Sequence, residues 1–211
     1  TSYITSQNIS IISSKELLKA ACCNLSESFE TNPSIDVNFS DAVSGTKQIK
    51  MLGLNSPYIL ITNENIPAVR GAAQVYGMSF IPGSWVESIQ VTKGAGSVIN
   101  GFESITGQIN AELVKPLTDP KLFVNLYGSI NGRLELNTHL NTRLDSNWST
   151  GFYIHANNRN QTFDKNKDSF LDMPLGKQIN VMNKWQYTNL EKGLISFINF
   201  RFLDDQKQTC L

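Results

Sequence analysis

The chain has 211 residues, enough for one sizeable domain or two small ones, and its 18 basic side chains balance 18 acidic ones. This zero net charge argues against a nucleic-acid-binding protein, and the low charged fraction of 17% is offset by uncharged polar residues, including 22 Asn and 21 Ser. No apolar run approaches the ~20 residues of a membrane-spanning helix, and no signal peptide is recognisable, which excludes a helical membrane protein but leaves a membrane β-barrel open.

The first part of the chain predicts a small α+β unit. Ser13 and Glu16 fit the capping box of a helix, whose apolar face repeats at helical spacing as far as Phe29. Short strand-like runs follow, separated by glycine and Asn-rich turns, at residues 48–52, 58–62, 86–93 and 107–114. Because two prolines and several turn residues occupy 115–120, we place a boundary there and expect domains at 1–116 and 117–211.

After this boundary the hydrophobic period changes to two, which is typical of β-strands. In residues 133–144, Leu and Thr alternate without a break with polar or charged side chains, which predicts a strand about 40 Å long at ~3.3 Å per residue. Such a strand is about twice as long as the usual strand of a soluble protein. Five strands are expected, at residues 122–130, 133–144, 148–157, 178–188 and 193–203, with one longer connection at 158–176.

Two architectures are compatible with this alternation. A soluble β-sandwich would bury the apolar face, whereas a transmembrane barrel would turn it toward lipid and leave the polar face on the lumen. The strand length, the fully polar opposite face and the alternation of tight turns with a long loop favour the barrel. His139 and His155 fall on the polar face, where we expect them to line a lumen rather than bind metal. Trp148, Trp185 and Tyr187 lie near strand ends and fit an interfacial aromatic girdle, although sandwich cores also contain Trp.

The glycine-rich part of the first domain carries the motif that identifies a family. Residues 85–110 read WVESIQVTKGAGSVINGFESITGQIN and resemble the end of the plug domain of TonB-dependent outer-membrane receptors. In that family, a strand ending in (K/R)-G precedes the segment G-x-x-A-(I/V)-x-G-x-I-N. The residues that occupy these places here include Lys93, Gly94, Gly101, Gly107 and Asn110.

Two upstream segments are similar to further strands of the same plug domain. Residues 49–54 match I-x-(I/L)-R-G at Gly53, with Leu52 in place of the usual arginine. Residues 58–67 are similar to P-x-(V/L)-x-(V/I)-D-G-(V/I)-P, with Glu64-Asn65 in place of Asp-Gly. The matches follow one another in the family's order between residues 10 and 116, which makes a chance resemblance unlikely.

The resemblance implies an α+β plug domain at 1–116, followed at 117–211 by the first antiparallel strands of an incomplete transmembrane β-barrel. Family barrels have about 22 strands, so we expect the chain to be the first part of a longer protein. The implied function is TonB-dependent uptake, across the outer membrane of a Gram-negative bacterium, of a scarce ligand. A metal chelate such as a ferric siderophore is favoured, with cobalamin, another metal complex or a glycan as alternatives.

The implied partners are TonB, the small-molecule or metal-complex ligand and outer-membrane lipid, with no nucleic acid. Four motif glycines, Gly53, Gly94, Gly101 and Gly107, are assigned structural roles, as are Lys93 and Asn110. The alternative is a soluble or secreted β-rich ligand-binding module with a small α+β domain. No nucleophile, carboxylate pair or phosphate-binding loop is recognisable, so no enzymatic activity is expected.

One loop and one cysteine pair are weaker candidates for metal binding. Oxygen ligands at positions 1, 3, 5 and 9 of a calcium-loop pattern are supplied by Asp164, Asn166, Asp168 and Asp172. Ser169 and Leu175 replace the glycine and the glutamate of that pattern, so a solvated loop between strands is the alternative. Cys22 and Cys23 are adjacent on the predicted helix, where small buried side chains are expected and a soft-metal role is the alternative.

Overall fold

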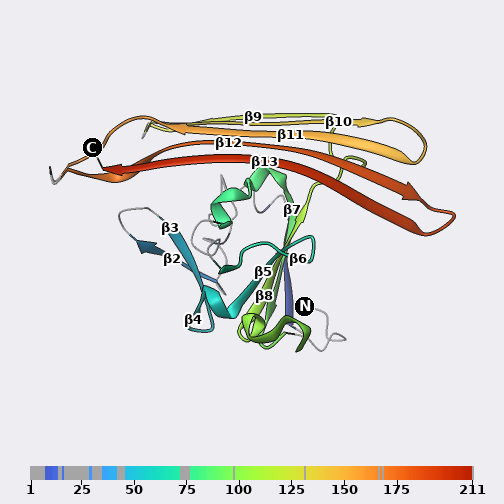
Figure 1. The fold of residues 1–211 in the computed structure, drawn as a ribbon, viewed down its shortest axis with the longest axis horizontal. Coiled ribbons are helices and arrows are strands. Elements are labelled where there is room, and N and C mark those ends of the chain that lie inside the picture. The colour runs from blue at the N-terminus through green and yellow to red at the C-terminus, as the bar shows by residue number, and fades with distance from the viewer. Residues whose placement is uncertain are drawn as a thin grey trace. The chain divides into compact units, whose positions relative to one another are not determined.

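The computed structural model describes residues 8–13, 16, 29, 35–41, 46–71, 77–96, 98–130, 132–165, 167 and 169–210. The chain forms two compact units, which we call unit 1 and unit 2 (Figure 1). Apart from residues 43–45, the division falls between Leu113 and Val114. Within the described part of the chain, no helix has the length and apolar character needed to cross a membrane.

Unit 1 is built on a five-stranded mixed sheet with the order β1-β7-β8-β5-β6. Its strands are β1 (Asn8–Ser13), β5 (Ile59–Asn63), β6 (Ile66–Pro67), β7 (Val86–Lys93) and β8 (Gly107–Leu113). β5 and β8 pair in parallel, and the other neighbours are antiparallel. A second, antiparallel sheet contains β2 (Asp36–Asp41), β3 (Thr46–Met51) and β4 (Leu54–Asn55).

A row of β-branched side chains runs across the centre of the mixed sheet. Ile61 of β5 lies opposite Ile109 of β8, which in turn lies opposite Val91 of β7, and all three are fully buried. Such side chains pack well on a pleated surface because their χ1 angles are already restricted. This row explains why the strands at 58–62, 86–93 and 107–114 could be predicted from local patterns.

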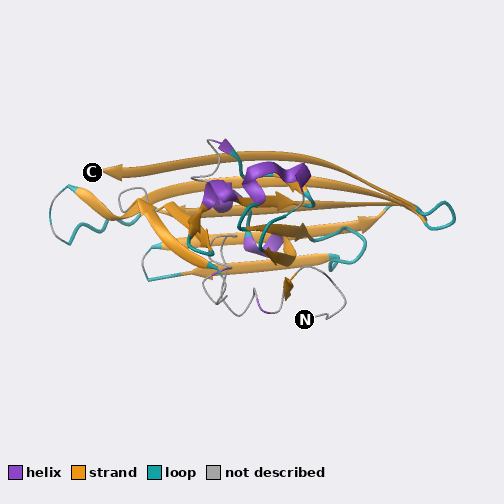
Figure 2. Cartoon of the chain, turned by 90° about the horizontal axis from the view of Figure 1, so that it is seen from below, coloured by secondary structure: helices purple, strands orange, loops and turns teal. Residues whose placement is uncertain are grey.

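Short 3₁₀ turns, shown in purple in Figure 2, connect these strands. They include η2 (Ser56–Tyr58), η4 (Gly77–Phe80), η5 (Gly83–Trp85) and η6 (Val98–Ser104). One of the two bonds of the predicted capping box is present: the Glu16 carboxylate accepts a hydrogen bond from the Ser13 backbone N–H at 2.9 Å, and it also accepts one from the Ser13 hydroxyl at 3.3 Å. The body of the predicted helix, including Cys22 and Cys23, lies outside the described residues.

Unit 2 is a single antiparallel meander with the order β13-β12-β11-β10-β9, as Figure 1 shows. Its strands are β9 (Leu122–Gly128), β10 (Arg133–Arg143), β11 (Trp148–Arg159), β12 (Phe170–Asn189) and β13 (Leu194–Cys210). The predicted fold class is confirmed: a unit with a mixed sheet precedes five antiparallel strands. In the described residues the sheet stays open, with β9 and β13 at its edges.

Two strands of unit 2 are much longer than their hydrophobic pattern predicts. β12 has 20 residues and β13 has 17, and their outer ends pair through the backbone, for example Leu175 with Gln208. The outer end of β13 is rich in polar residues, and that of β12 contains Pro174, which lies at an irregularity in the register where a missing N–H is tolerated. Backbone hydrogen bonds between β12 and β13, rather than hydrophobic alternation, extend these two strands. The connection between β11 and β12 is therefore shorter than the predicted 158–176.

The turn between β3 and β4 contains an unusual residue. Leu52 and Gly53 form a two-residue hairpin loop between the paired Met51 and Leu54, and both have positive φ, 52° and 80°. A type I′ turn requires this conformation, which Asn-Gly adopts most readily. Leu52 occupies the left-handed region with a side chain that is 67% exposed.

Replacing Leu52 with Asn should therefore stabilise unit 1. We expect the free energy of unfolding to rise by about 1 kcal/mol, because a leucine in the left-handed region costs about that much. Urea-induced unfolding of the chain measures the change. Leu54→Asn, at the exposed neighbouring position with an ordinary φ, is the matched control and should give no gain. An unchanged or lower midpoint for Leu52→Asn would contradict the assignment of strain to this residue.

Candidate functional site

The loop between β7 and β8 contains several glycines of the sequence motif. Gly94 leaves β7 with a φ of 89°, and Gly101 interrupts η6 with a φ of 63°. Two backbone hydrogen bonds close the loop, from Gly94 N–H to the Thr106 carbonyl at 2.9 Å and from Gly96 N–H to the Ser104 carbonyl at 2.8 Å. Positive φ at Gly94 and Gly101 explains why glycine occupies these positions.

Gly107 has a different structural reason to be glycine. It begins β8 opposite the half-buried Lys93, the last residue of β7. A Cβ at this position would lie 2.5 Å from the Thr92 carbonyl oxygen and against the Met51 sulfur. The absence of a side chain thus lets the backbone of β8 approach that of β7.

Asn110 joins three segments of unit 1 through its buried amide, which is 3% exposed. The amide oxygen accepts hydrogen bonds from the Thr62 hydroxyl and the Asn65 backbone N–H, both at 2.9 Å. Its NH₂ group donates to the Glu112 carboxylate at 2.9 Å. Glu64 and Asn65, which replace the family's Asp-Gly, have φ values of 51° and 64°, so the β5–β6 turn keeps a conformation that suits Asp-Gly.

The polarity of the sheet in unit 2 is the reverse of that in a soluble sandwich. On one side of β10, Leu134, Leu136 and Leu140 are 61%, 37% and 48% exposed, and Leu144, directly after the strand, is 55% exposed. On the other side, Glu135, Asn137, His139 and Asn141 are all less than 10% exposed. We call these sides the apolar face and the polar face. The leucines therefore do not pack beneath a second sheet, as the sandwich alternative requires.

Four side chains at one end of the polar face form a cluster that we call the linker clamp: Asp119, His139, Asn141 and Tyr153. The Asp119 carboxylate lies 3.0 Å from His139 Nδ1 and accepts a hydrogen bond from the Asn141 amide at 2.7 Å. That amide also donates to the Pro120 carbonyl at 2.8 Å, and its oxygen accepts from the Tyr153 hydroxyl at 2.8 Å. The clamp thus fixes the segment before β9 to β10 and β11.

A second group of polar side chains crosses the same face farther along the strands. His155 Nδ1 lies 2.7 Å from the Asn137 amide oxygen, and Asn137 donates to the Glu135 carboxylate at 3.2 Å. On β12 and β13, Gln178 donates to the Asp205 carboxylate at 3.2 Å. Both histidines thus lie on the polar face, as expected, with carboxylate or amide partners.

Sequence reasoning placed His139 on the polar face but did not identify its partners. Asp119 and Tyr153 belong to different segments, and only the register of β9, β10 and β11 brings them together. The available signal was the polar Asp119 in a turn-rich segment, which has no local feature that points to a histidine 20 residues later.

The candidate calcium loop is described only in part. The Asp172 carboxylate accepts a hydrogen bond from the Lys165 backbone N–H at 3.0 Å, and the Asp164 carboxylate accepts one from the Ser169 backbone N–H at 3.1 Å. Asn166 and Asp168 lie outside the described residues. Among the residues that are described, no group of three or more His, Cys, Asp or Glu could hold a metal ion. The calcium site stays a prediction.

Removing the clamp's amide should release the segment before β9. The substitution Asn141→Ala removes the side-chain hydrogen bonds to Asp119 and Pro120. We expect trypsin to cleave after the exposed Lys121 about tenfold faster in this variant than in the original chain, because a tenfold change corresponds to a loss of ~1.4 kcal/mol of local stability. Cleavage after Lys192, in the distant β12–β13 turn, is the internal reference. Asn157→Ala, farther along the same face, is the control variant. Equal acceleration at both lysines would indicate general destabilisation and contradict a local clamp.

The Asn110 amide should be important for the stability of unit 1. Asn110→Ala leaves the buried Thr62 hydroxyl and the Asn65 N–H without their shared acceptor, and we expect a loss of about 2 kcal/mol in the free energy of unfolding. Gln108→Ala, two residues earlier on β8, removes only one 3.3 Å hydrogen bond and should cost clearly less. Urea-induced unfolding compares the two variants, and equal losses would contradict the special role of Asn110.

Comparison with known proteins agrees with this geometry. The family model of the TonB-dependent receptor plug domain matches residues 2–108, while curated protein sequences give no significant match. Similar solved structures are the ferric-catecholate import receptor Fiu from E. coli K12, the siderophore receptor PiuA from Acinetobacter baumannii and the pyoverdine receptor FpvA from Pseudomonas aeruginosa PAO1. Their TM-scores are 0.71, 0.72 and 0.73, at sequence identities of 16%, 15% and 16%.

These alignments cover 94%, 96% and 98% of this chain, but only 27%, 27% and 29% of the respective receptors. The chain therefore spans little more than a quarter of their length. At such low identity the likeness shows a shared fold, which includes strands like those at the start of the receptors' barrels. The family match is independent of this likeness and covers half of the chain. The protein belongs to the TonB-dependent receptor plug domain family.

Proposed function

We propose that this protein is an outer-membrane receptor that takes up a ferric chelate, with residues 1–116 as its plug and residues 117–211 as the first strands of its barrel wall. The observation that carries the proposal is the reversed polarity of unit 2. A sheet that exposes leucines and buries Glu, Asn and His suits a wall between lipid and a polar lumen. β10 and β11, with 11 and 12 residues, have about the length that a tilted transmembrane strand needs.

The features of unit 1 support its role as a plug. A plug has to fill a lumen and still rearrange when cargo passes, which favours tight glycine turns and polar contacts between segments. The glycine-closed loop between β7 and β8 and the Asn110 hydrogen bonds are of this kind. Energy for the rearrangement would come from TonB, as the family membership suggests.

The class of ligand is inferred from the structural neighbours. Fiu is a ferric-catecholate import receptor, PiuA is a siderophore receptor, and FpvA is a pyoverdine receptor. We therefore favour a ferric siderophore over cobalamin or a glycan. The ligand would bind to loops of the plug and of the wall on the outer side of the membrane.

Uptake by cells tests this proposal. Disrupting the gene that encodes the chain should lower the uptake of at least one radiolabelled ferric siderophore about tenfold, because passive entry of such large polar complexes is slow. A protonophore should reduce uptake in the parent strain to the same level, since transport would use energy delivered by TonB. Cobalamin uptake and a complemented strain are the controls. Unchanged uptake of catecholate, hydroxamate and pyoverdine chelates, with the protein absent from the outer-membrane fraction, would overturn the proposal.

A further inference from the structure

The charged side chains of unit 2 are distributed unevenly between its two faces. Within the ladder that the structure describes from β10 to β13, six basic side chains lie on the polar face, against the acidic side chains of Glu135 and Asp205. Asp119, which reaches this face from the linker, adds one more carboxylate. The six basic residues are Arg133, Arg143, Arg159, Lys184, Arg201 and Lys207. Because the whole chain has zero net charge, the polar face concentrates positive charge.

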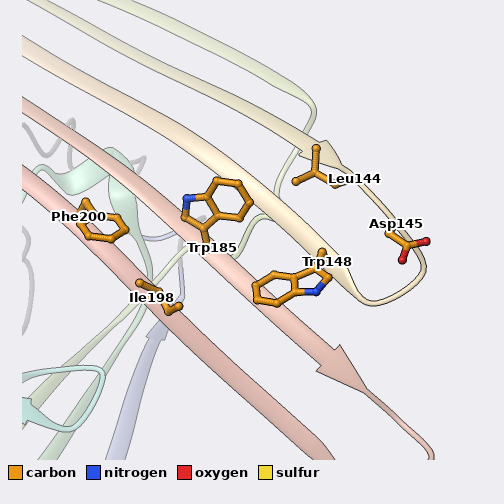
Figure 3. Close-up of a pocket in the computed structure, with 6 residues that line it drawn as sticks. All are labelled: Leu144, Asp145, Trp148, Trp185, Ile198 and Phe200. Carbon is orange, nitrogen blue, oxygen red and sulfur yellow. The ribbon is translucent and has the colours of Figure 1, made fainter.

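The apolar face has no such excess. In the same regular ladder its charged residues are Lys177 and Asp204, which balance each other. Near the tight turns, the apolar face contains a hollow of about 470 Å³ (Figure 3). The residues that line this hollow are Leu144, Asp145, Trp148, Trp185, Ile198 and Phe200. Positive charge is therefore a property of the polar face rather than of the whole sheet.

Three of the six cations form a row across one end of the sheet. Arg133 of β10 lies directly opposite Arg159 of β11. Gly176 of β12 separates Arg159 from Lys207 of β13 and is paired with both. Residues that lie directly opposite each other point to the same face, so the three side chains share the polar face. We call Arg133, Arg159 and Lys207 the basic row.

The neighbouring row of the polar face carries fewer negative charges than the basic row carries positive ones. The carboxylate of Glu135 lies 3.1 Å from the Arg133 guanidinium, and that of Asp205 lies 3.6 Å from the Lys207 ammonium. On β11 the corresponding position, two residues before Arg159, is the uncharged Asn157. Like charges directly opposite each other, such as Arg133 and Arg159, destabilise a sheet. An anion bound beside them would reduce this repulsion.

Gly176 leaves the polar face open between Arg159 and Lys207. Its φ is not positive, so the backbone conformation does not require glycine. Apart from its chain neighbours, a Cβ at this position would meet only the Gln206 carbonyl oxygen within 4 Å, at an ordinary distance of 3.8 Å. Close packing therefore does not explain the glycine either. Glycine inside a strand often marks a place where a ligand approaches, and at ~4.8 Å between strands the opening is about 10 Å wide.

The chemistry of the basic row favours an anion with several oxygens. The guanidinium of Arg159 presents its N–H donors in a planar fork that matches a pair of oxygens, and the ammonium of Lys207 adds a point charge. The side chains of Arg133 and Lys207 are only 17% and 29% exposed, and salt screens partly buried charges less than exposed ones. Three dianionic catecholates leave a ferric complex negatively charged, whereas three monoanionic hydroxamates leave it neutral. Only the first kind of chelate gains from these cations.

The basic row lies at the end of the strands that is away from the tight β10–β11 and β12–β13 turns. β10 begins at Arg133, and the longer connection to β12 follows Arg159, as Figure 1 shows. In membrane barrels the longer loops lie on the outer side, and the polar face lines the lumen. Under the proposed function, a ligand that enters from outside would therefore meet this row.

We propose that the basic row binds a negatively charged group of the ferric chelate in the opening at Gly176, so that the receptor prefers anionic chelates to neutral ones. The inference rests on the proposed function, because it requires the polar face to line the path of the chelate. It goes further by assigning the charge of the ligand and three side chains that recognise it. Arg159 contributes most, because it adjoins both Arg133 and the opening.

Binding of radiolabelled ferric chelates to cells tests the site. The gene is disrupted, the full-length protein or a variant is restored from a plasmid, and a protonophore blocks transport so that only binding is measured. A ferric catecholate and ferric citrate are the anionic probes, and a ferric tris-hydroxamate is the neutral reference. The better bound anionic probe should half-saturate at a concentration about tenfold lower than the neutral one. Arg159→Gln should raise that concentration about tenfold, the effect of losing a charge-assisted hydrogen bond.

Three further variants separate the site from other effects. Lys177→Gln removes the same charge next to Gly176 but on the apolar face, and should bind like the original protein. Gly176→Val fills the opening without changing any charge, and should weaken binding of the anionic probe. Immunoblots of the outer-membrane fraction normalise the amounts. If Arg159→Gln does not reach the membrane, Lys207→Gln provides the same test.

The outcomes distinguish this inference from the proposed function. Unchanged binding in either Arg159→Gln or Gly176→Val, an equal loss in Lys177→Gln, or equal affinity for the neutral chelate would overturn the basic row as an anion site while leaving the receptor function intact. If cells with the original protein bind no more of any ferric chelate than the disrupted strain does, the proposed function itself fails.

Discussion

A sheet that buries its polar side has to satisfy the amides, carboxylates and imidazoles on that side with hydrogen bonds. Unit 2 does so for several of them: Asn141 bonds to Asp119 and Tyr153, and Asn137 to His155. Burying such a group without a partner costs about 1–3 kcal/mol. The arrangement of the polar face therefore depends on a precise register, and the long antiparallel ladders provide it.

A polar side chain on the apolar face must also find hydrogen-bond partners. Asn183 is polar and points to the apolar side, yet its amide bonds to Trp185, Thr150 and Gly151 and so adds no unsatisfied group. In unit 1, Asn110 acts similarly by linking β8 to the β5–β6 turn. Asparagine is well suited to these roles because one short side chain donates and accepts at the same time. The high Asn content of the chain thus has specific structural uses in both units.

Features that depend on residues close together in the sequence could be predicted, whereas features that depend on residues far apart in the sequence could not. The strands at 86–93 and 133–144 are encoded by local alternation, so these predictions were confirmed. The contact between Ser13 and Glu16 is a local pattern too, and one bond of the predicted capping box is present there. β1 was missed because most of its bulk, including Ile11, is exposed and its pairing partner β7 lies more than 70 residues away. The linker clamp was missed for the same reason, since it arises from strand register. The positive φ of Leu52 has no sequence signal at all.

The linker clamp affects how the chain would resist a force applied to unit 1. The segment from Asp119 to Lys121 is held at three consecutive residues: Asn141 binds the Asp119 carboxylate and the Pro120 carbonyl with its side chain, and the Lys121 carbonyl with its backbone N–H. Bonds at adjacent residues share a load, so they must break nearly together instead of one after another. Tension transmitted along the chain from unit 1 would end at this point, and the hydrogen bonds between β9 and β10 would not be peeled apart from their first residue.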